Sequence, residues 1–293
     1  MRCAVTVASL LCLLLPAFAG DRPSVRVAAL QCWTPMGEVG YNRKLLTRMI
    51  EVAAGRGAAI VVTPECAVQG YLDPLRDVAW TKAAARADRR RPVAAVAEPV
   101  PGAATRYFGR LAAKYKLYLC LGMIEAADGK FYNAQVLLDP KGEIAAHHRK
   151  QTLWPPGDIS AFEKANEKVQ VVETEYGRLG LMICYEVHTR PPKLARAKAD
   201  IVLYSVAWYG GNTRNWFRNL FPRLHVKPHG YAVIAANWSS PLKGPSWAGA
   251  GYSAIYDASG KVLAQVDSAR KPRVLVAELP LRRRRDRDDD GGG

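Results

Sequence analysis

The segment GRLGLMICYEVHTRPPKLARAKADIVLYSVAW, residues 177–208, decides the fold class. Its first part is an apolar strand-like run that ends at Cys184, where the polarity changes at once. A short helix with proline at its start is expected over 191–199, followed by an apolar strand over 200–208. Because buried strands alternate with a helix, this segment predicts an α/β fold in which helices cover a sheet.

The same alternation extends along the rest of the chain. Helical spacing of apolar residues predicts a helix over 42–55, with Asn42 as its cap, and a second helix over 101–116. Strands, some paired through turns, are expected over 24–32, 58–65, 117–125, 131–150, 168–186, 229–240 and 251–266. No linker rich in proline, glycine or serine interrupts the chain, so we expect one domain over 24–280.

Reactive side chains stand where three of the predicted strands end, namely Glu65, Lys150 and Cys184. Burying such groups without a function would cost free energy. A thiol attacks carbon as the thiolate, so it needs a base or a cation nearby. A buried carboxylate can take the thiol proton, and an ammonium group can stabilise an oxyanion. Together these groups suffice for acyl transfer from an amide or a nitrile, without histidine or metal.

Other interpretations of Cys184 are a small buried side chain and one half of a disulfide. If it is the nucleophile, the backbone N–H of Tyr185 is a candidate second oxyanion donor. Trp208 and Trp154 are candidates for the substrate pocket, although aromatic side chains also serve ordinary packing. The pair His147–His148 lacks further ligands at suitable spacing, so we expect no metal site.

Three motifs give the chain its resemblance to a known family. They are VVTPECAVQGY around Glu65, HHRKQTLWPPGD around Lys150 and GRLGLMICYE around Cys184. In this order, and with similar flanking sequence over nearly all of 24–280, they resemble the carbon–nitrogen hydrolase (nitrilase) superfamily. The resemblance implies a four-layer α-β-β-α sandwich, a reaction that needs no cofactor, and a homodimer or larger homo-oligomer. It also implies a general base at Glu65, an oxyanion stabiliser at Lys150, and a nucleophile at Cys184 that forms a thioester.

Some positions depart from the pattern of that superfamily. Many members have a second catalytic glutamate after the lysine, and Asp158 is the preferred equivalent here, with Glu163 as the alternative. Asp158 is also explained as a turn or helix-capping residue. Glu186 stands where many members have aspartate, and we expect it to be structural. The residues 227–229, Lys-Pro-His, stand where members usually have a glutamate, so the resemblance does not extend to subunit contacts or pocket detail there, although it still includes the triad.

The two ends of the chain have distinct compositions. Residues 1–19 have a positive start, an apolar run and a small-x-small pattern, as is typical of a signal peptide. We therefore expect an exported protein, periplasmic or secreted, rather than one with a retained anchor helix. No later segment is apolar for long enough to span a membrane. The terminal LRRRRDRDDDGGG, residues 281–293, is expected to be a charged disordered tail.

The net charge of +16 favours an anionic partner or simply a well-solvated surface. No strip of alternating basic and aromatic residues indicates nucleic-acid binding. The remaining cysteines outside the signal segment lack a CxxC motif, which argues against a thioredoxin-like role. Cys32 and Cys66 form a disulfide or, as we prefer, remain buried thiols.

The leading hypothesis is an exported thiol hydrolase that cleaves a small linear amide or an N-carbamoyl compound. A nitrilase or an amine N-acyltransferase with the same triad is the alternative among enzymes. From another class, the alternative is a non-catalytic basic protein that binds envelope polymers on the same scaffold. The intact triad argues against this last interpretation.

Overall fold

The computed structural model describes residues 23–73, 78–79, 93–155, 158–208, 212–240 and 251–282. The expected signal peptide, and the tail from residue 283 onward, lie outside the described residues. The described chain forms two six-stranded sheets and a small hairpin of β3 (Leu72–Asp73) and β4 (Val78–Ala79).

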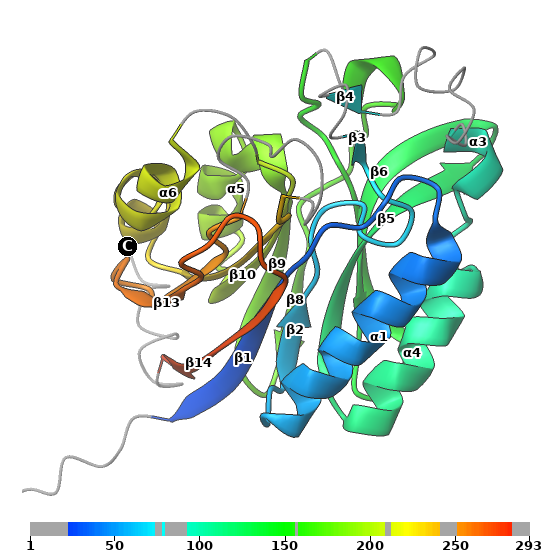
Figure 1. The fold of residues 1–293 in the computed structure, drawn as a ribbon. Helices are drawn as coiled ribbons and strands as arrows, with labels where there is room; N and C mark the ends of the chain where they lie inside the picture. Colours follow the sequence, from blue (N-terminus) through cyan, green and yellow to red (C-terminus); the bar gives the residue numbers. More distant parts are fainter. Residues whose placement is uncertain are drawn as a thin grey trace, which may run out of the picture.

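The first sheet has the strand order β14-β1-β2-β5-β6-β7. Its strands are β1 (Ser24–Gln31), β2 (Ile60–Val62), β5 (Tyr118–Ala127), β6 (Lys130–Leu138), β7 (Ile144–Arg149) and β14 (Arg273–Pro280). Strands β1, β2 and β5 are parallel, and the remaining pairs are antiparallel. Helices α1 (Val39–Gly55) and α4 (Ala103–Tyr115) lie together on its outer face (Figure 1).

The second sheet has the strand order β13-β12-β11-β10-β9-β8. Its strands are β8 (Val171–Thr174), β9 (Gly177–Ile183), β10 (Ile201–Val206), β11 (Ala232–Asn237), β12 (Ala254–Tyr256) and β13 (Val262–Gln265). Helix α5 (Pro191–Arg196) covers its outer face together with a helical segment that runs from α6 (Thr213–Asn215) to His229 (Figure 1). The short helix η2 (Cys184–His188) follows β9 directly.

The inner faces of the two sheets pack against each other. Alternation along β1 shows this arrangement, because Val27 and Ala29 contact the inner core while Ala28 and Leu30 contact the layer of α1 and α4. The inner core continues through Leu181 and other strand residues of the second sheet. The four-layer α-β-β-α sandwich expected from the sequence is therefore confirmed. Within the described residues, no helix has the length and apolar character needed to cross a bilayer.

Several local expectations were wrong. Asn42 is not a helix cap, because α1 begins at Val39 and the buried Asn42 amide donates to the carbonyl oxygens of Pro35 and Val68. Strand β14, which pairs with β1 along its whole length, was not predicted. No helix was predicted over 208–228, whereas Thr213–His229 is helical.

Candidate active site

Elements of both sheets bring the candidate catalytic residues together. Glu65 follows β2 and Lys150 follows β7 in the first sheet, whereas Cys184 follows β9 in the second. Asp158 begins the short helix η1 (Asp158–Ser160), which follows the strand that leads to Lys150. All four side chains are buried, with 8% of Cys184 exposed and none of the other three.

Lys150 lies between two carboxylates. Its Nζ is 2.6 Å from Glu65 Oε1 and 2.7 Å from Asp158 Oδ2. Burial alone would lower the pKa of Lys150, but Asp158 and Glu65 raise it well above its usual value. Lys150 is therefore an ammonium ion, and its two ion pairs use two of its three N–H donors. The geometry places Asp158 in this cluster, whereas Glu163 is exposed.

Two further residues, Asn133 and Tyr71, complete the polar cluster and were missed in the sequence analysis. The amide of Asn133, on β6, donates to Glu65 Oε1 at 2.7 Å and to Asp158 Oδ1 at 3.3 Å. The hydroxyl of Tyr71 donates to Asp158 Oδ1 at 2.8 Å. One signal for Asn133 was present, since a polar amide in the apolar strand FYNAQVLL requires a buried partner.

Glu65 retains one oxygen for chemistry. In the described part of the chain, its Oε2 is buried and has no hydrogen-bond partner. Burial raises the pKa of Glu65 above its ordinary value of 4.5, although Lys150 opposes the shift, and the charge of Asp158 adds to it. A carboxylate with a raised pKa and a free oxygen is suited to accept and return a proton.

Cys184 stands at a sharp turn between β9 and η2. Its backbone φ is +37°, and its carbonyl oxygen accepts a hydrogen bond from the Tyr204 hydroxyl at 2.8 Å. Burial and the charge of Glu65 raise the pKa of the Cys184 thiol well above its usual value, while Lys150 and a backbone hydrogen bond with Ala207 lower it. The resting side chain is therefore the thiol, and it must lose its proton as it reacts.

Glu186 ties the turn of Cys184 to the end of β7. Its Oε2 accepts from Ile183 N at 2.9 Å, its Oε1 accepts from Gln151 N at 2.7 Å, and both oxygens lie near His148 Nε2. Burial alone would raise the pKa of Glu186, but His148, Arg190 and the backbone hydrogen bond from Gln151 hold it at about 2. Glu186 is thus structural, as expected from the sequence.

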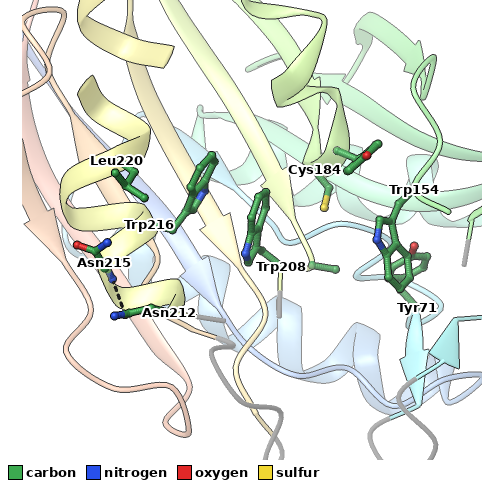
Figure 2. A pocket seen from close by; sticks show the side chains of 10 residues that line it. Tyr71, Trp154, Cys184, Trp208, Asn212, Asn215, Trp216 and Leu220 are labelled. Carbon is green, nitrogen blue, oxygen red and sulfur yellow. Dashed lines mark hydrogen bonds between the residues drawn. The ribbon is translucent and has the colours of Figure 1, made fainter. Parts of the chain in front are cut away.

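A pocket of about 480 Å³ opens beside Cys184. Figure 2 shows the Cys184 sulfur pointing toward the space between Trp208 on one side and Trp154 and Tyr71 on the other. The other described lining residues are Tyr185, Ala207, Asn212, Asn215, Trp216 and Leu220. Trp208 and Trp154 are therefore pocket residues, and the Tyr185 side chain lines the pocket as well. The oxyanion role of the Tyr185 N–H stays a prediction.

Asn237 fixes the backbone at Trp208. Its Oδ1 accepts from Trp208 N at 2.9 Å, and its Nδ2 donates to Trp208 O at 3.2 Å and to Gly251 O at 2.8 Å. Asn237 is fully buried. This amide therefore holds the pocket wall in place, a role that the sequence analysis did not assign to it.

Among the remaining candidates, the two histidines lie beside carboxylates and the other cysteines are free thiols. Nε2 of His147 lies 2.7 Å from Glu125 Oε2, and Nε2 of His148 lies near Glu186. No cluster of three or more histidine, cysteine or acidic residues with metal-binding geometry occurs among the described residues. Cys32 and Cys66 are free buried thiols, as preferred from the sequence, and Cys120 and Cys184 are also free.

Comparison with solved structures supports the fold. An amidase of the nitrilase superfamily from Nesterenkonia, solved as a variant, superimposes with a TM-score of 0.72 at 22% identity, over 92% of this chain and 96% of that chain. Another structure of this amidase, in complex with butyramide, gives a TM-score of 0.71 at 22% identity and covers 93% of this chain and 100% of that one.

Sequence relatives include hydrolases, nitrilases and amidases. A hydrolase from Schizosaccharomyces pombe is 31% identical over 199 residues, which cover 62% of this chain and 59% of that protein. An omega-amidase from Xenopus laevis is 28% identical over 279 residues, 87% of this chain and 92% of that protein. A bifunctional nitrilase/nitrile hydratase from Oryza sativa is 29% identical, over 56% of this chain and 47% of that protein.

The first of these relatives and the rice protein are matched over about half to three-fifths of their own length. The family comparison covers more of the chain, since residues 26–287 match the carbon-nitrogen hydrolase family. This match includes Glu65, Lys150 and Cys184, and it agrees with the resemblance found in the sequence. The chain belongs to the carbon–nitrogen hydrolase family.

Proposed function

We propose that this protein is a cysteine hydrolase that cleaves the non-peptide C–N bond of a small amide or N-carbamoyl compound through a thioester. The observation that supports the proposal most strongly is the buried cluster of Glu65, Lys150 and Asp158, whose charges act on the thiol of Cys184, a lining residue of the pocket. Burying such a cluster of ionised groups in an apolar interior costs free energy, and clusters of this kind are concentrated at functional sites.

The first half of the reaction forms the acyl-enzyme. As the Cys184 sulfur attacks the amide carbonyl carbon, the thiol proton moves to Glu65 Oε2, the oxygen without a partner among the described residues. The electron pair of the carbonyl moves onto its oxygen, which the third N–H of Lys150 stabilises. Glu65 then gives the proton to the nitrogen, the C–N bond breaks, and ammonia or an amine leaves.

The second half regenerates the thiol. The oxygen of a water molecule attacks the thioester carbon while Glu65 takes a proton from that water, and Lys150 again stabilises the oxyanion. The C–S bond breaks, the acid leaves, and the proton on Glu65 returns to Cys184. Asp158, fixed by Tyr71 and Asn133, holds Lys150 in its charged form throughout.

Two alternative activities use the same groups. A nitrilase takes a nitrile in place of an amide, and an amine N-acyltransferase passes the acyl group to an amine in place of water. Export to the periplasm or medium and assembly into a homo-oligomer also stay proposals. They rest on the composition of residues 1–19 and on the family resemblance. N-terminal sequencing of secreted protein and sedimentation analysis would test them separately.

The test is intact-protein mass spectrometry with iodoacetamide, and then with short amides such as butyramide, N-carbamoyl amines and nitriles. We expect single alkylation at Cys184, a trapped acyl adduct with the true substrate class, and release of ammonia or amine. Cys184→Ala should abolish the adduct and turnover, and Glu65→Gln and Lys150→Ala should slow acylation by about 10²-fold or more. Cys32→Ala, which removes another buried free thiol, is the matched control and should remain active.

Near-normal turnover in any of the three site variants would contradict the triad. No adduct with any compound, together with salt-sensitive polyanion binding that Cys184→Ala leaves unchanged, would instead support the non-catalytic binding protein.

A further inference from the structure

The described residues that line the pocket beside Cys184 are mostly aromatic, and none of them carries a charge. The indoles of Trp208 and Trp216 stack with their ring centroids 4.5 Å apart and an interplanar angle of 14°. In Figure 2, Trp208 lies between Trp216 and the Cys184 sulfur, so one indole of the stack borders the reacting atom. Trp154 and Tyr71 lie on the opposite side of that sulfur. The space next to the sulfur is therefore bounded by flat aromatic surfaces.

None of the lining side chains in the described part of the chain is an acid, a lysine or an arginine. The arginines nearest in sequence on the helical wall, Arg214 and Arg218, are exposed and are not lining residues. Behind the indoles, His188 contacts Trp208, and His225 contacts Trp216. Burial lowers the pKa of His188 and lowers that of His225 to about 4, so both rings are neutral at pH 7.

The polar groups at the far end of the pocket are two amides. Asn212 Oδ1 accepts from Asn215 N at 3.0 Å, and Asn215 Oδ1 accepts from Asn219 Nδ2 at 2.8 Å. Both acceptor oxygens are thus used within the helix. The NH₂ groups of Asn212 and Asn215 have no partner among the described residues, so they remain available as neutral donors.

The volume of the pocket gives a further criterion for the substrate. A pocket of about 480 Å³ falls in the range of roughly 300–1,000 Å³ that holds drug-sized ligands. It exceeds the needs of the shortest amides. Aromatic rings gain most from contact with such walls, through apolar burial and through ring–ring contact. A carboxylate would lose its hydration there, and no described lining residue is a cation that would compensate for the loss.

We propose that the acyl half of the substrate is uncharged and carries an aromatic group that lies against Trp208, and that the pocket rejects a carboxylated acyl chain. This inference rests on the proposed function, because it concerns the acyl group that Cys184 would take. It adds a substrate class, the neutral arylalkyl amide, that the C–N bond chemistry alone does not specify.

The test compares kcat/KM for a matched set of amides with the unmodified enzyme. The set is 3-phenylpropanamide, the same compound with a para-carboxylate, and butyramide. We expect 3-phenylpropanamide to exceed butyramide by about tenfold, from ring contact. We expect it to exceed its carboxylate by about tenfold or more, from the uncompensated charge. Equal or reversed ratios would overturn the inference.

A pair of variants tests the charge argument independently. Asn215→Lys places a cation on the pocket wall and should raise kcat/KM for the para-carboxylate relative to the neutral amide by about tenfold. Leu224→Lys makes the same charge change on an exposed residue of the same helical segment that does not line the pocket, and should leave the ratio unchanged. The same ratio change in both variants would contradict a role for the pocket wall.

The outcomes also separate this inference from the proposed function. Turnover of butyramide that depends on Cys184, with both aryl compounds inert, would overturn the aromatic acyl group and leave the hydrolase intact. No turnover of any of the three amides would overturn the inference, and no adduct at Cys184 with any compound of the wider set of amides, N-carbamoyl amines and nitriles would overturn the proposed function as well.

Discussion

Cys184 adopts a backbone conformation that costs free energy in any residue other than glycine. Its φ of +37° lies in the left-handed region, where the cost is about 1–2 kcal/mol. The turn from β9 into η2 requires this angle, and the hydrogen bond from Tyr204 to the Cys184 carbonyl helps to maintain it. The strain aims the sulfur into the pocket instead of into the core behind the strand.

This strain predicts an unusual order of stability among inactive variants. Cys184→Gly should be more stable than Cys184→Ala by about 1 kcal/mol, because only glycine adopts the angle without steric cost. Urea unfolding at pH 7 would measure the difference, and loss of turnover in both variants would serve as the control. An alanine variant as stable as the glycine variant would show that the turn relaxes and stores no strain.

Protonation of Glu65 should cause the fall of kcat/KM at low pH, which is the acidic limb of the pH profile. Its pKa is raised above 4.5, chiefly by burial, and the base is active as the carboxylate, so kcat/KM should fall as the pH drops through a value above 4.5. Asn133 lowers this pKa through its hydrogen bond, so Asn133→Ala should move the limb to higher pH. Glu163→Gln, at an exposed site, should not move it. A limb at or below pH 4.5 would argue against Glu65 as the base.

At the scale of elements, one carboxylate couples the turn of Cys184 with the end of β7. Glu186 accepts backbone hydrogen bonds from Ile183 and from Gln151, the neighbours of Cys184 and Lys150. Its pKa of about 2 lies below the ordinary 4.5, so it contributes about 3 kcal/mol of stability that is present above pH 4.5. That contribution is lost as the pH falls from about 4.5 to about 2.

Glu186→Gln should therefore lower the free energy of unfolding at pH 7 by a few kcal/mol and weaken its dependence on pH below 4.5. The matched control is Glu278→Gln, because Glu278 pairs with Arg26 at a half-exposed site, where an ion pair contributes about 0–1 kcal/mol. Denaturant unfolding from pH 2.5 to pH 7 would compare the two. Similar pH profiles in both variants would contradict the assigned role of Glu186.

Elements with strong local signals could be predicted from the sequence, and those that depend on distant partners could not. Apolar runs ending in Glu65 and Cys184 marked β2 and β9, because buried parallel strands are continuously apolar. In contrast, β14 is a partly buried edge strand whose assignment depends on its pairing with β1. The buried Asn42 looked like a cap, since the sequence does not show that the carbonyl groups of Pro35 and Val68 lie beside it.

At the scale of the whole molecule, the candidate site forms only where the two sheets meet. The first sheet supplies Glu65 and Lys150, and the second supplies Cys184. Hydrogen bonds between the sheets converge beside Glu65, since its N–H donates to Val206 O at 3.4 Å and its carbonyl accepts from Trp238 Nε1 at 2.8 Å. The sequence could supply the residues of each sheet, but Asn133 and Tyr71 became visible only in this assembled arrangement.

A buried polar network fixes the distance between the sheets. Gln135 on β6 donates to Leu203 O and to Ser205 Oγ on β10, and Ser205 donates to Thr63 O at 2.7 Å. Thr63 precedes Pro64 and Glu65 in the chain, so this network links the position of the general base to the second sheet. Its loss should therefore affect catalysis as well as stability.

Gln135→Leu should lower the free energy of unfolding by about 1–3 kcal/mol, because it removes the donor to two buried acceptors. Leu137→Ala, two residues along the same face of β6, should cost about 2–5 kcal/mol through lost packing in the inner core. Although the second change costs more stability, we expect Gln135→Leu to lower kcat/KM more, because only it disturbs the link to Glu65. Unfolding and kinetic measurements on both variants would decide, and losses of kcat/KM that simply follow stability would show that the network acts only in packing the sheets.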